Sequence, residues 1–364
     1  MTPTGNFNRI LQIHPSRRCN LHCLHCYSAS GPEERDQLSV PLLLQAISNA
    51  SEQGYTIASF SGGEPLVYKP LPELLKQAHQ CQMHTTVTSN GILLDERHLE
   101  QLCGAVDLLA ISLDGIPASH NRIRSSDQAF EKMAARLEGV RQSGIPFGFI
   151  FTLTKQNFRE LDWVANFALE QGAKLLQIHP LAEVGHASQS LVGSRPSTNV
   201  LSYAYLKAMR LREAIGDKIF IQIDLVHQDL LRSNPGSFFA DEALINQHNY
   251  CFADLVSPLI IEADGTVVPI QHGFDRNYAL GNLNDASLSE LATHWRQERY
   301  PSFRKLCRRV YQQLTAPADM PIIDWYETLM RQPKMSHENK TTTGVSIGSK
   351  KSYSLMPTTS RFKT

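Results

Sequence analysis

The chain lacks any stretch of apolar residues long enough to cross a membrane, and it has no excess of either charge. No run of about 18 apolar residues occurs in the sequence, and residues 1–10 lack the charged-then-apolar layout of a signal peptide. Lysine plus arginine and aspartate plus glutamate number 35 each, so no polybasic surface is expected. We therefore expect no membrane or nucleic-acid partner and a cytoplasmic location.

Cysteine is scarce and unevenly placed, which argues against a disulfide framework. There are seven cysteines, an odd number, and Cys19, Cys23 and Cys26 lie close together. In a reducing compartment such a group is typical of a metal site. Internal repeats are also lacking, and residues 335–364 are rich in Ser, Thr and Lys with almost no aromatics. We expect this tail to be disordered.

What the chain does have is a regular alternation of short β-type and helical segments. The expected strands cover residues 7–14, 56–60, 84–88, 108–113, 146–152 and 174–178, and the expected helices cover 41–54, 71–82, 95–103, 128–143 and 158–171. Six strand–helix units with short connections predict parallel strands and right-handed crossovers. We predict an α/β fold built on a partial (β/α)6 TIM-type barrel, open along one side, with its chemistry at the carboxyl ends of the strands.

The rhythm changes after the sixth strand. A helix over 201–215 and a strand over 219–226 are expected in a connecting region. A small α+β extension follows, with a hairpin over 259–270 that turns at Asp264-Gly265 and a helix over 287–299. The predicted division is a barrel core over 1–187, a connecting region over 188–250, the extension over 251–330 and the tail over 335–364.

The cysteine group directly follows the first expected strand. Three thiolates can hold three irons of a four-iron cluster and leave the fourth iron open to a substrate, whereas a closed four-ligand site has no open position. The neighbouring Arg17 and Arg18 are expected to favour thiolate over thiol. The alternative is a structural zinc loop. The histidines that could complete such a loop are His14, His22 and His25.

Polar motifs also follow the later strands. Ser61-Gly62-Gly63-Glu64-Pro65 comes after the second strand, where two glycines would let the backbone approach a ligand and Glu64 would add a carboxylate. Ser89-Asn90-Gly91 follows the third strand and offers hydrogen-bond donors and acceptors. The alternatives are an ordinary glycine turn and an ordinary Asn-Gly turn.

The fourth strand ends in Ser112-Leu113-Asp114-Gly115, with His120 and Arg124 close behind. A guanidinium matches a carboxylate bidentately, so Arg124 is a candidate for binding a carboxylate of a ligand. The alternative is that Asp114 and Arg124 pair with each other on the surface.

The motifs in this order resemble those of the radical S-adenosylmethionine (SAM) superfamily, over roughly residues 7–187. The resemblance implies that Cys19, Cys23 and Cys26 hold one [4Fe–4S] cluster. It assigns Glu64 to the amino group of SAM, Ser89 and Asn90 to the ribose, and Arg124 to the carboxylate. The residues that it assigns to the cofactor are Tyr27, Gly62, Gly63, Glu64, Pro65, Ser89, Asn90, Ser112, Asp114, Arg124, Asn157 and His179. For His179 the alternative is a satisfied histidine at the edge of the core.

The implied activity is reductive cleavage of SAM to a 5′-deoxyadenosyl radical, which abstracts a hydrogen atom from a substrate. Such an enzyme needs an electron donor of the flavodoxin or ferredoxin type. We expect a ribosomally made precursor peptide as substrate, with a separate peptide-recognition protein as a possible partner. The alternatives are a small metabolite of the tetrapyrrole or sugar type, or a non-catalytic metal-binding scaffold.

The C-terminal extension resembles a degenerate SPASM or twitch domain, a unit that binds auxiliary clusters in this superfamily. Ile270 and Gln271 occupy the neighbourhood where that pattern has a cysteine, and only Cys251 and Cys307 remain in the region. Two cysteines do not ligate an ordinary four-iron cluster. We therefore expect both to be small apolar fillers, or a source of a returned hydrogen atom if either faces the barrel mouth.

Overall fold

The computed structural model describes residues 9–240, 250–317 and 321–332. The first seven strands are joined by six parallel pairs, each between one strand and the next along the chain. These strands are β1 (Ile10–Ile13), β2 (Ile57–Phe60), β3 (His84–Ser89), β4 (Leu108–Ser112), β5 (Phe147–Leu153), β6 (Leu175–Pro180) and β7 (Phe220–Ile223). The predicted α/β fold with a partial parallel barrel is confirmed, and the strands end at one common edge.

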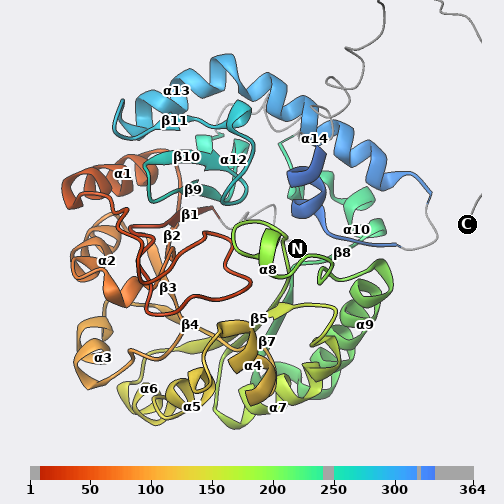
Figure 1. Ribbon diagram of the computed structural model, residues 1–364. Helices are drawn as coiled ribbons and strands as arrows, with labels where there is room; N and C mark the ends of the chain where they lie inside the picture. The colour runs from red at the N-terminus through yellow and green to blue at the C-terminus, as the bar shows by residue number, and fades with distance from the viewer. Residues whose placement is uncertain (1–8, 241–249, 318–320, 333–364) are drawn as a thin grey trace, which may run out of the picture.

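Helices form an outer layer around this sheet (Figure 1). They are α1 (Val40–Glu52), α2 (Leu71–Gln80), α3 (Glu96–Leu102), α4 (Pro117–Arg124), α5 (Ala129–Ala134), α6 (Leu137–Ser143), α7 (Leu161–Glu170) and α9 (Thr198–Ile215). The short helix α8 (Ala187–Ser190) lies inside this ring, near the middle of the view in Figure 1. In α1, a proline in the first turn starts the helix and an apolar face that includes Leu43 and Ile47 is buried. The single helix expected over 128–143 is two helices, α5 and α6.

The C-terminal extension continues the sheet of the barrel. Its strands are β9 (Leu259–Ile261), β10 (Thr266–Pro269) and β11 (Gly281–Asn282). The predicted hairpin is present as the antiparallel pair β9 and β10, and β9 also runs parallel to β1. Within the described residues the sheet order is therefore β11-β10-β9-β1-β2-β3-β4-β5-β6-β7. Barrel and extension share one hydrophobic core.

The remaining elements cover the extension and close its side. They are β8 (Val226–His227), α10 (Gln228–Ser233), α12 (Phe252–Leu255), α13 (Leu288–Glu298), α14 (Tyr300–Thr315) and β12 (Ile322–Ile323). Trp295 of α13 is fully buried, packs on Phe252 and Phe303, and donates to the carbonyl of Tyr278 at 2.8 Å. β12 pairs with β8, which brings the residues after 321 beside the end of β7. The predicted disordered tail lies outside the described residues.

Candidate functional site

The loop that follows β1 carries the three clustered cysteines and is closed on itself by backbone hydrogen bonds. The amide of Cys19 donates to Gly31 at 3.1 Å, and the amide of Gly31 donates to Arg17 at 3.2 Å. The loop therefore has a defined conformation, which we call the cysteine loop (residues 15–38).

Each of the three sulfurs has a nitrogen donor beside it. The amides of Leu21 and Ser30 donate to Sγ of Cys19 and Cys26 at 3.4 and 3.3 Å. Nη1 of Arg124 lies 3.8 Å from Sγ of Cys23. Donors aimed at sulfur stabilise thiolate and tune iron–sulfur clusters. This donor set fits a cluster held through three thiolates.

Burial works against thiolate in the metal-free chain. It raises the pKa of Cys19 to about 12 and that of Cys23 to about 11, with Arg124 opposing the shift at Cys23. The expectation that Arg17 would favour thiolate is wrong, because its guanidinium is paired with Glu34 and Asp36. The cation nearest to a sulfur comes from α4 instead.

The glycine turn after β2 packs directly on the cysteine loop. The amides of Gly63 and Glu64 donate to the carbonyls of Ser16 and Arg18 at 2.9 and 3.0 Å. A Cβ added at Gly63 would lie 2.1 Å from the carbonyl oxygen of Arg18, and one at Gly62, where φ is +107°, would lie 2.7 Å from that of Ser16. The close approach that these glycines permit is thus to the loop that carries the sulfurs.

Glu64 links this turn to the end of β3. Its carboxylate accepts from Oγ of Ser89 at 2.9 Å, from the amide of Asn90 at 2.8 Å and from the amide of Leu66 at 3.2 Å. Burial raises its pKa, and these hydrogen bonds oppose the rise. Nδ2 of Asn90 donates to Asn20 of the cysteine loop at 2.7 Å. The structure therefore brings the second and third motifs together in one buried network.

Asp114 and Arg124 pair with each other, but in the interior and not on the surface. Nε of Arg124 lies 2.7 Å from Oδ2 of Asp114, whose side chain is inaccessible to solvent. Burial would raise the pKa of Asp114, but the charge of Arg124 holds it well below its usual range. The pair points the guanidinium at Cys23, so the fourth motif also reaches the cysteine loop.

Asn157 and Ser112 lie beside this pair. Nδ2 of Asn157 donates to the carbonyls of Asp114 and Thr152 at 3.1 and 2.9 Å, and Oδ1 accepts from the amide of Thr154 at 2.7 Å. All its polar atoms are used in bracing the ends of β4 and β5. Ser112 is the buried last residue of β4.

Tyr27 belongs to the cysteine loop and is half-buried. Its hydroxyl lies 3.0 Å from Oγ of Ser61 and 3.4 Å from Nε2 of His14, and burial raises its pKa to about 12. His14 in turn stacks on His272, at 4.9 Å between ring centroids. The extension thus contributes a ring to the floor of the site.

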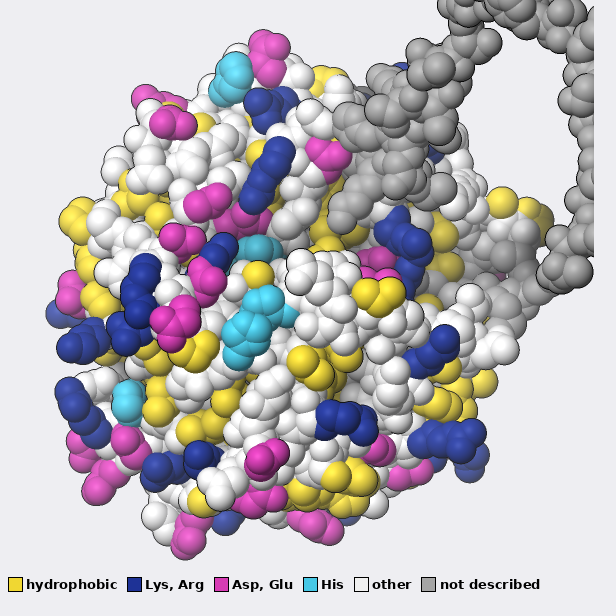
Figure 2. Space-filling model, viewed as in Figure 1, with side chains coloured by type: hydrophobic (Ala, Val, Ile, Leu, Met, Phe, Trp, Pro, Cys, Tyr) yellow, Lys and Arg dark blue, Asp and Glu magenta, His cyan; other side chains and the backbone are white. Residues whose placement is uncertain are grey.

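The histidines that could complete a zinc loop have other contacts. His22 stacks on His186 at 4.2 Å, and Nε2 of His25 faces Asp114 at 3.8 Å. Among the described residues, no three His, Cys, Asp or Glu side chains are grouped so as to hold a single metal ion. Figure 2 shows histidine side chains gathered near the middle of the face that it presents.

The resemblance assigns His179 to the cofactor, and the structure pairs it with Asp224. Nδ1 lies 3.0 Å from Oδ2 of that carboxylate, which directly follows β7. The segment after β6 does reach the cysteine loop, because the amide of His186 donates to the carbonyl of Cys26 at 2.8 Å. Sequence reasoning missed Asp224, although a carboxylate at the carboxyl end of a strand is the signal that identified the other motifs.

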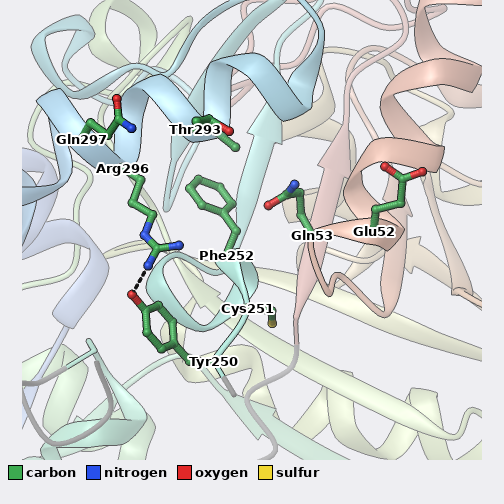
Figure 3. Close-up of a pocket in the computed structure, with 9 residues that line it drawn as sticks. Glu52, Gln53, Tyr250, Cys251, Phe252, Thr293, Arg296 and Gln297 are labelled. Atoms are coloured by element: carbon green, nitrogen blue, oxygen red, sulfur yellow. Dashed lines mark hydrogen bonds between the residues drawn. The ribbon is translucent and has the colours of Figure 1, made fainter. Parts of the chain in front are cut away.

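Cys251 and Cys307 do not face the barrel mouth. Cys251 lies against Gly54, just before β2, at the amino ends of the strands; a Cβ at Gly54 would lie 2.3 Å from its Sγ. It lines a separate pocket with Tyr250 and Arg296, which are hydrogen-bonded to each other (Figure 3). Cys307 is buried in α14. Return of a hydrogen atom was expected only from a cysteine that faces the barrel mouth, and neither thiol does so.

An open parallel barrel with three thiols, a buried carboxylate and a buried arginine at its carboxyl edge is an architecture suited to a redox metalloenzyme. Residues 13–168 match the family model of the radical SAM superfamily. They are a radical SAM domain, and the chain is an enzyme whose cofactors are one [4Fe–4S] cluster and SAM.

Relatives of known activity act on different substrates. The chain is 28% identical to Fe-coproporphyrin III synthase of Methanosarcina barkeri, over 76% of this chain and 72% of that protein. It is 30% identical to PqqA peptide cyclase of Granulibacter bethesdensis, over 60% of this chain and 59% of that protein. The fold is similar to that of Streptococcus suis SuiB bound to SAM, with a TM-score of 0.64 and 17% identity over 82% of this chain and 68% of SuiB.

No helix in the described ranges is long and apolar enough to cross a membrane.

Proposed function

We propose that Cys19, Cys23 and Cys26 hold the [4Fe–4S] cluster and leave one iron open to SAM. The support is the donor beside each sulfur and the packing of the glycine turn on the cysteine loop. When bound, cluster and SAM together supply reductive cleavage of SAM and abstraction of a hydrogen atom from the substrate. The chain's own part is to fix the sulfurs and to bury the site.

The SAM contacts are proposed from the same geometry. Glu64 offers a buried carboxylate to the amino group, and Ser89 and Asn90 hold that carboxylate while facing the ribose. Arg124 uses Nε on Asp114 and Nη1 on Cys23, and its remaining nitrogen is proposed to meet the SAM carboxylate. The residues proposed around them are Tyr27, Gly62, Gly63, Pro65, Ser112, Asp114 and Asn157.

We further propose a ribosomally made precursor peptide as the substrate. The observation that carries this choice is a small cleft of about 10 Å³ where β6 and β7 end, lined in part by the carboxylates of Asp224, Asp324 and Glu327. The cation beside it, Arg195, is paired with Glu327 at 3.3 Å. Such a cleft suits the hydrogen-bonding groups of a peptide better than the propionates of a tetrapyrrole, which favour unpaired cations.

A tetrapyrrole is the second candidate, because the relative with 72% of its length covered is a coproporphyrin enzyme. The extension is proposed to be a SPASM- or twitch-like frame without auxiliary clusters, since Cys251 and Cys307 lie apart in separate elements. The predicted domain boundaries, a flavodoxin- or ferredoxin-type electron donor, a separate peptide-recognition protein and a cytoplasmic location complete the proposal.

The test is anaerobic reconstitution followed by incubation with SAM and a reductant. One arm contains short candidate precursor peptides, and the other contains a tetrapyrrole precursor of Fe-coproporphyrin III. We expect 5′-deoxyadenosine in both arms and a mass change only in the peptide. A mass change only in the tetrapyrrole would replace the first substrate by the second, and absence of 5′-deoxyadenosine would contradict the cofactor roles.

A further inference from the structure

A histidine and a carboxylate meet where two neighbouring strands end. His179 lies near the end of β6, and Asp224 directly follows β7, with its amide donating to the carbonyl of Ile178 at 3.0 Å. This pairing continues the β6–β7 register by one residue. The backbone thus fixes the two side chains beside each other, with Nδ1 of His179 3.0 Å from Oδ2 of Asp224.

Asp224 is held from both sides by glutamines. Nε2 of Gln177 donates to Oδ2 and Nε2 of Gln222 donates to Oδ1, each at 2.8 Å. A carboxylate fixed in this way sets the tautomer and orientation of the imidazole, because Nδ1 carries the proton that faces it. Nε2 of His179 is then the reactive nitrogen.

That nitrogen is available. His179 lines the cleft where the strands end, and its side chain is 40% exposed. Within residues 9–240, 250–317 and 321–332, Nε2 has no hydrogen-bond partner. Gln271 from the extension and Tyr326 from the segment after β12 form other walls of the cleft. Barrel and extension therefore both line this cleft.

We propose that His179 is the proton-transfer residue of the substrate site and that Asp224 is its positioning residue. Nε2 takes a proton from a nitrogen, oxygen or sulfur group of the peptide held in the cleft. The bond from that heteroatom to hydrogen breaks, its electron pair stays on the heteroatom, and the proton forms an N–H bond at Nε2. Asp224 stabilises the resulting imidazolium, and solvent later removes the proton. This step changes no oxidation state. It rests on the proposed function only for the identity of the substrate.

The charges around His179 oppose the effect of burial on the pKa of its imidazole. Burial would lower the pKa of His179, but the hydrogen bond and charge of Asp224, with the charges of Asp324 and Glu327, raise it. Burial also raises the pKa of Asp324, and burial with these carboxylates raises that of Tyr326 to about 12. The other charged groups that face this cluster are His25 of the cysteine loop and Arg195. A base whose pKa lies near the operating pH is the most effective in proton transfer.

The first test needs no substrate. Histidine-labelled protein is titrated by NMR as wild type, as Asp224→Asn and as His84→Gln, a control histidine 3.8 Å from Asp107 at the opposite ends of the strands. We expect the His179 signal to titrate above the ordinary value of about 6.5, to move down in Asp224→Asn and to stay in place in His84→Gln. An unchanged His179 titration in Asp224→Asn would overturn the dyad.

The second test uses the reconstituted enzyme with SAM, reductant and the candidate precursor peptide that the enzyme modifies. In His179→Gln we expect modified peptide to fall about 100-fold, and to fall far more than 5′-deoxyadenosine formation does. In Asp224→Asn the acid limb of the pH profile for product formation should move to lower pH. Parallel loss of both products, or loss of neither, would overturn the role. If the wild type cleaves SAM without changing any candidate peptide, the substrate proposal fails, and the NMR titration still decides the dyad.

Discussion

Two parts of the carboxyl edge of the sheet differ in how their polar groups are satisfied. Near β1 to β4, the sulfurs, Glu64 and Arg124 are largely buried, and each has a partner from the chain. Near β6 and β7, His179 is 40% exposed and one of its nitrogens is left for a ligand. We propose that the first part holds a fixed geometry for the cofactors and that the second leaves groups open for a substrate.

The two parts also differ in how the chain builds them. The cofactor part depends on one continuous loop, which later strand ends brace. The cleft near β7 combines β6, the residue after β7, the hairpin and the segment after β12. Changes in the first part should therefore affect cofactor binding, and changes in the second should affect what is made.

The largest effect is expected from losing one sulfur. Cys26→Ala removes one of three proposed iron ligands, so iron content and 5′-deoxyadenosine formation should fall to background. The matched control is Cys103→Ala, which removes an exposed thiol and should leave both unchanged. Iron analysis of the two reconstituted variants checks this, and equal iron contents would remove the distinction between the parts.

A smaller but large effect is expected from breaking the buried ion pair. Arg124→Met leaves Asp114 charged and unpaired in the interior, which should lower the free energy of unfolding by about 3–5 kcal/mol. The control is Lys207→Met, because Lys207 pairs with the half-exposed Asp162 and should contribute less than about 1 kcal/mol. Urea unfolding of both variants measures the difference. Similar losses would show that the pair is not specially important to the cofactor part.

Gly63→Ala should have the next largest effect. Its Cβ would lie 2.1 Å from the carbonyl oxygen of Arg18, so the cysteine loop must shift, at a cost of about 1–3 kcal/mol. Cluster occupancy should fall with it. The control, Gly139→Ala on α6, meets only a Leu99 methyl at 3.3 Å. Unfolding and iron content are measured together, and normal iron content in Gly63→Ala would contradict the bracing role of the turn.

The smallest effect is the pH dependence of stability from the cleft. The pKa of His179 is raised, so its contribution is full below about 6.5 and is lost as pH rises through the folded value. The pKa of Asp224 is lowered, so its contribution is lost as pH falls below its ordinary value of about 3.9. Because His179 is partly exposed, the pair should contribute less than about 1 kcal/mol. Wild type minus Asp224→Asn stability, measured from pH 4 to 9 in about one-unit steps, should be largest near pH 5 to 6. A stability difference that does not change with pH would contradict the pairing of His179 with Asp224.

Much of the cofactor part could be predicted from the sequence, because its motifs are contiguous and each follows a strand. The strand order of the parallel barrel follows from the same alternation. The prediction failed for the cation that lies beside the sulfurs. Arg17 is adjacent to Cys19 in sequence, yet it pairs with Glu34 and Asp36, and Arg124 on the unpredicted helix α4 approaches Cys23.

The cleft could not be predicted in the same way. Residues 219–226 were expected to be one strand, whereas β7 ends at Ile223 and leaves Asp224 at the edge beside His179. The pairing of β9 with β1 joins residues such as Leu11 and Leu259, which are about two thirds of the chain length apart. Hydrophobic periodicity and motif spacing describe local segments of the sequence. They therefore do not specify which distant segments meet at one edge of the sheet.

The central claim is that three sulfurs hold a [4Fe–4S] cluster with one iron open to SAM. The most direct measurement is the electron paramagnetic resonance spectrum of the anaerobically reconstituted, reduced protein before and after addition of SAM. A cluster signal that shifts on addition of SAM, and that does not shift in Glu64→Gln, is the predicted result. A protein that binds zinc in place of the cluster, or a cluster signal indifferent to SAM, would contradict it.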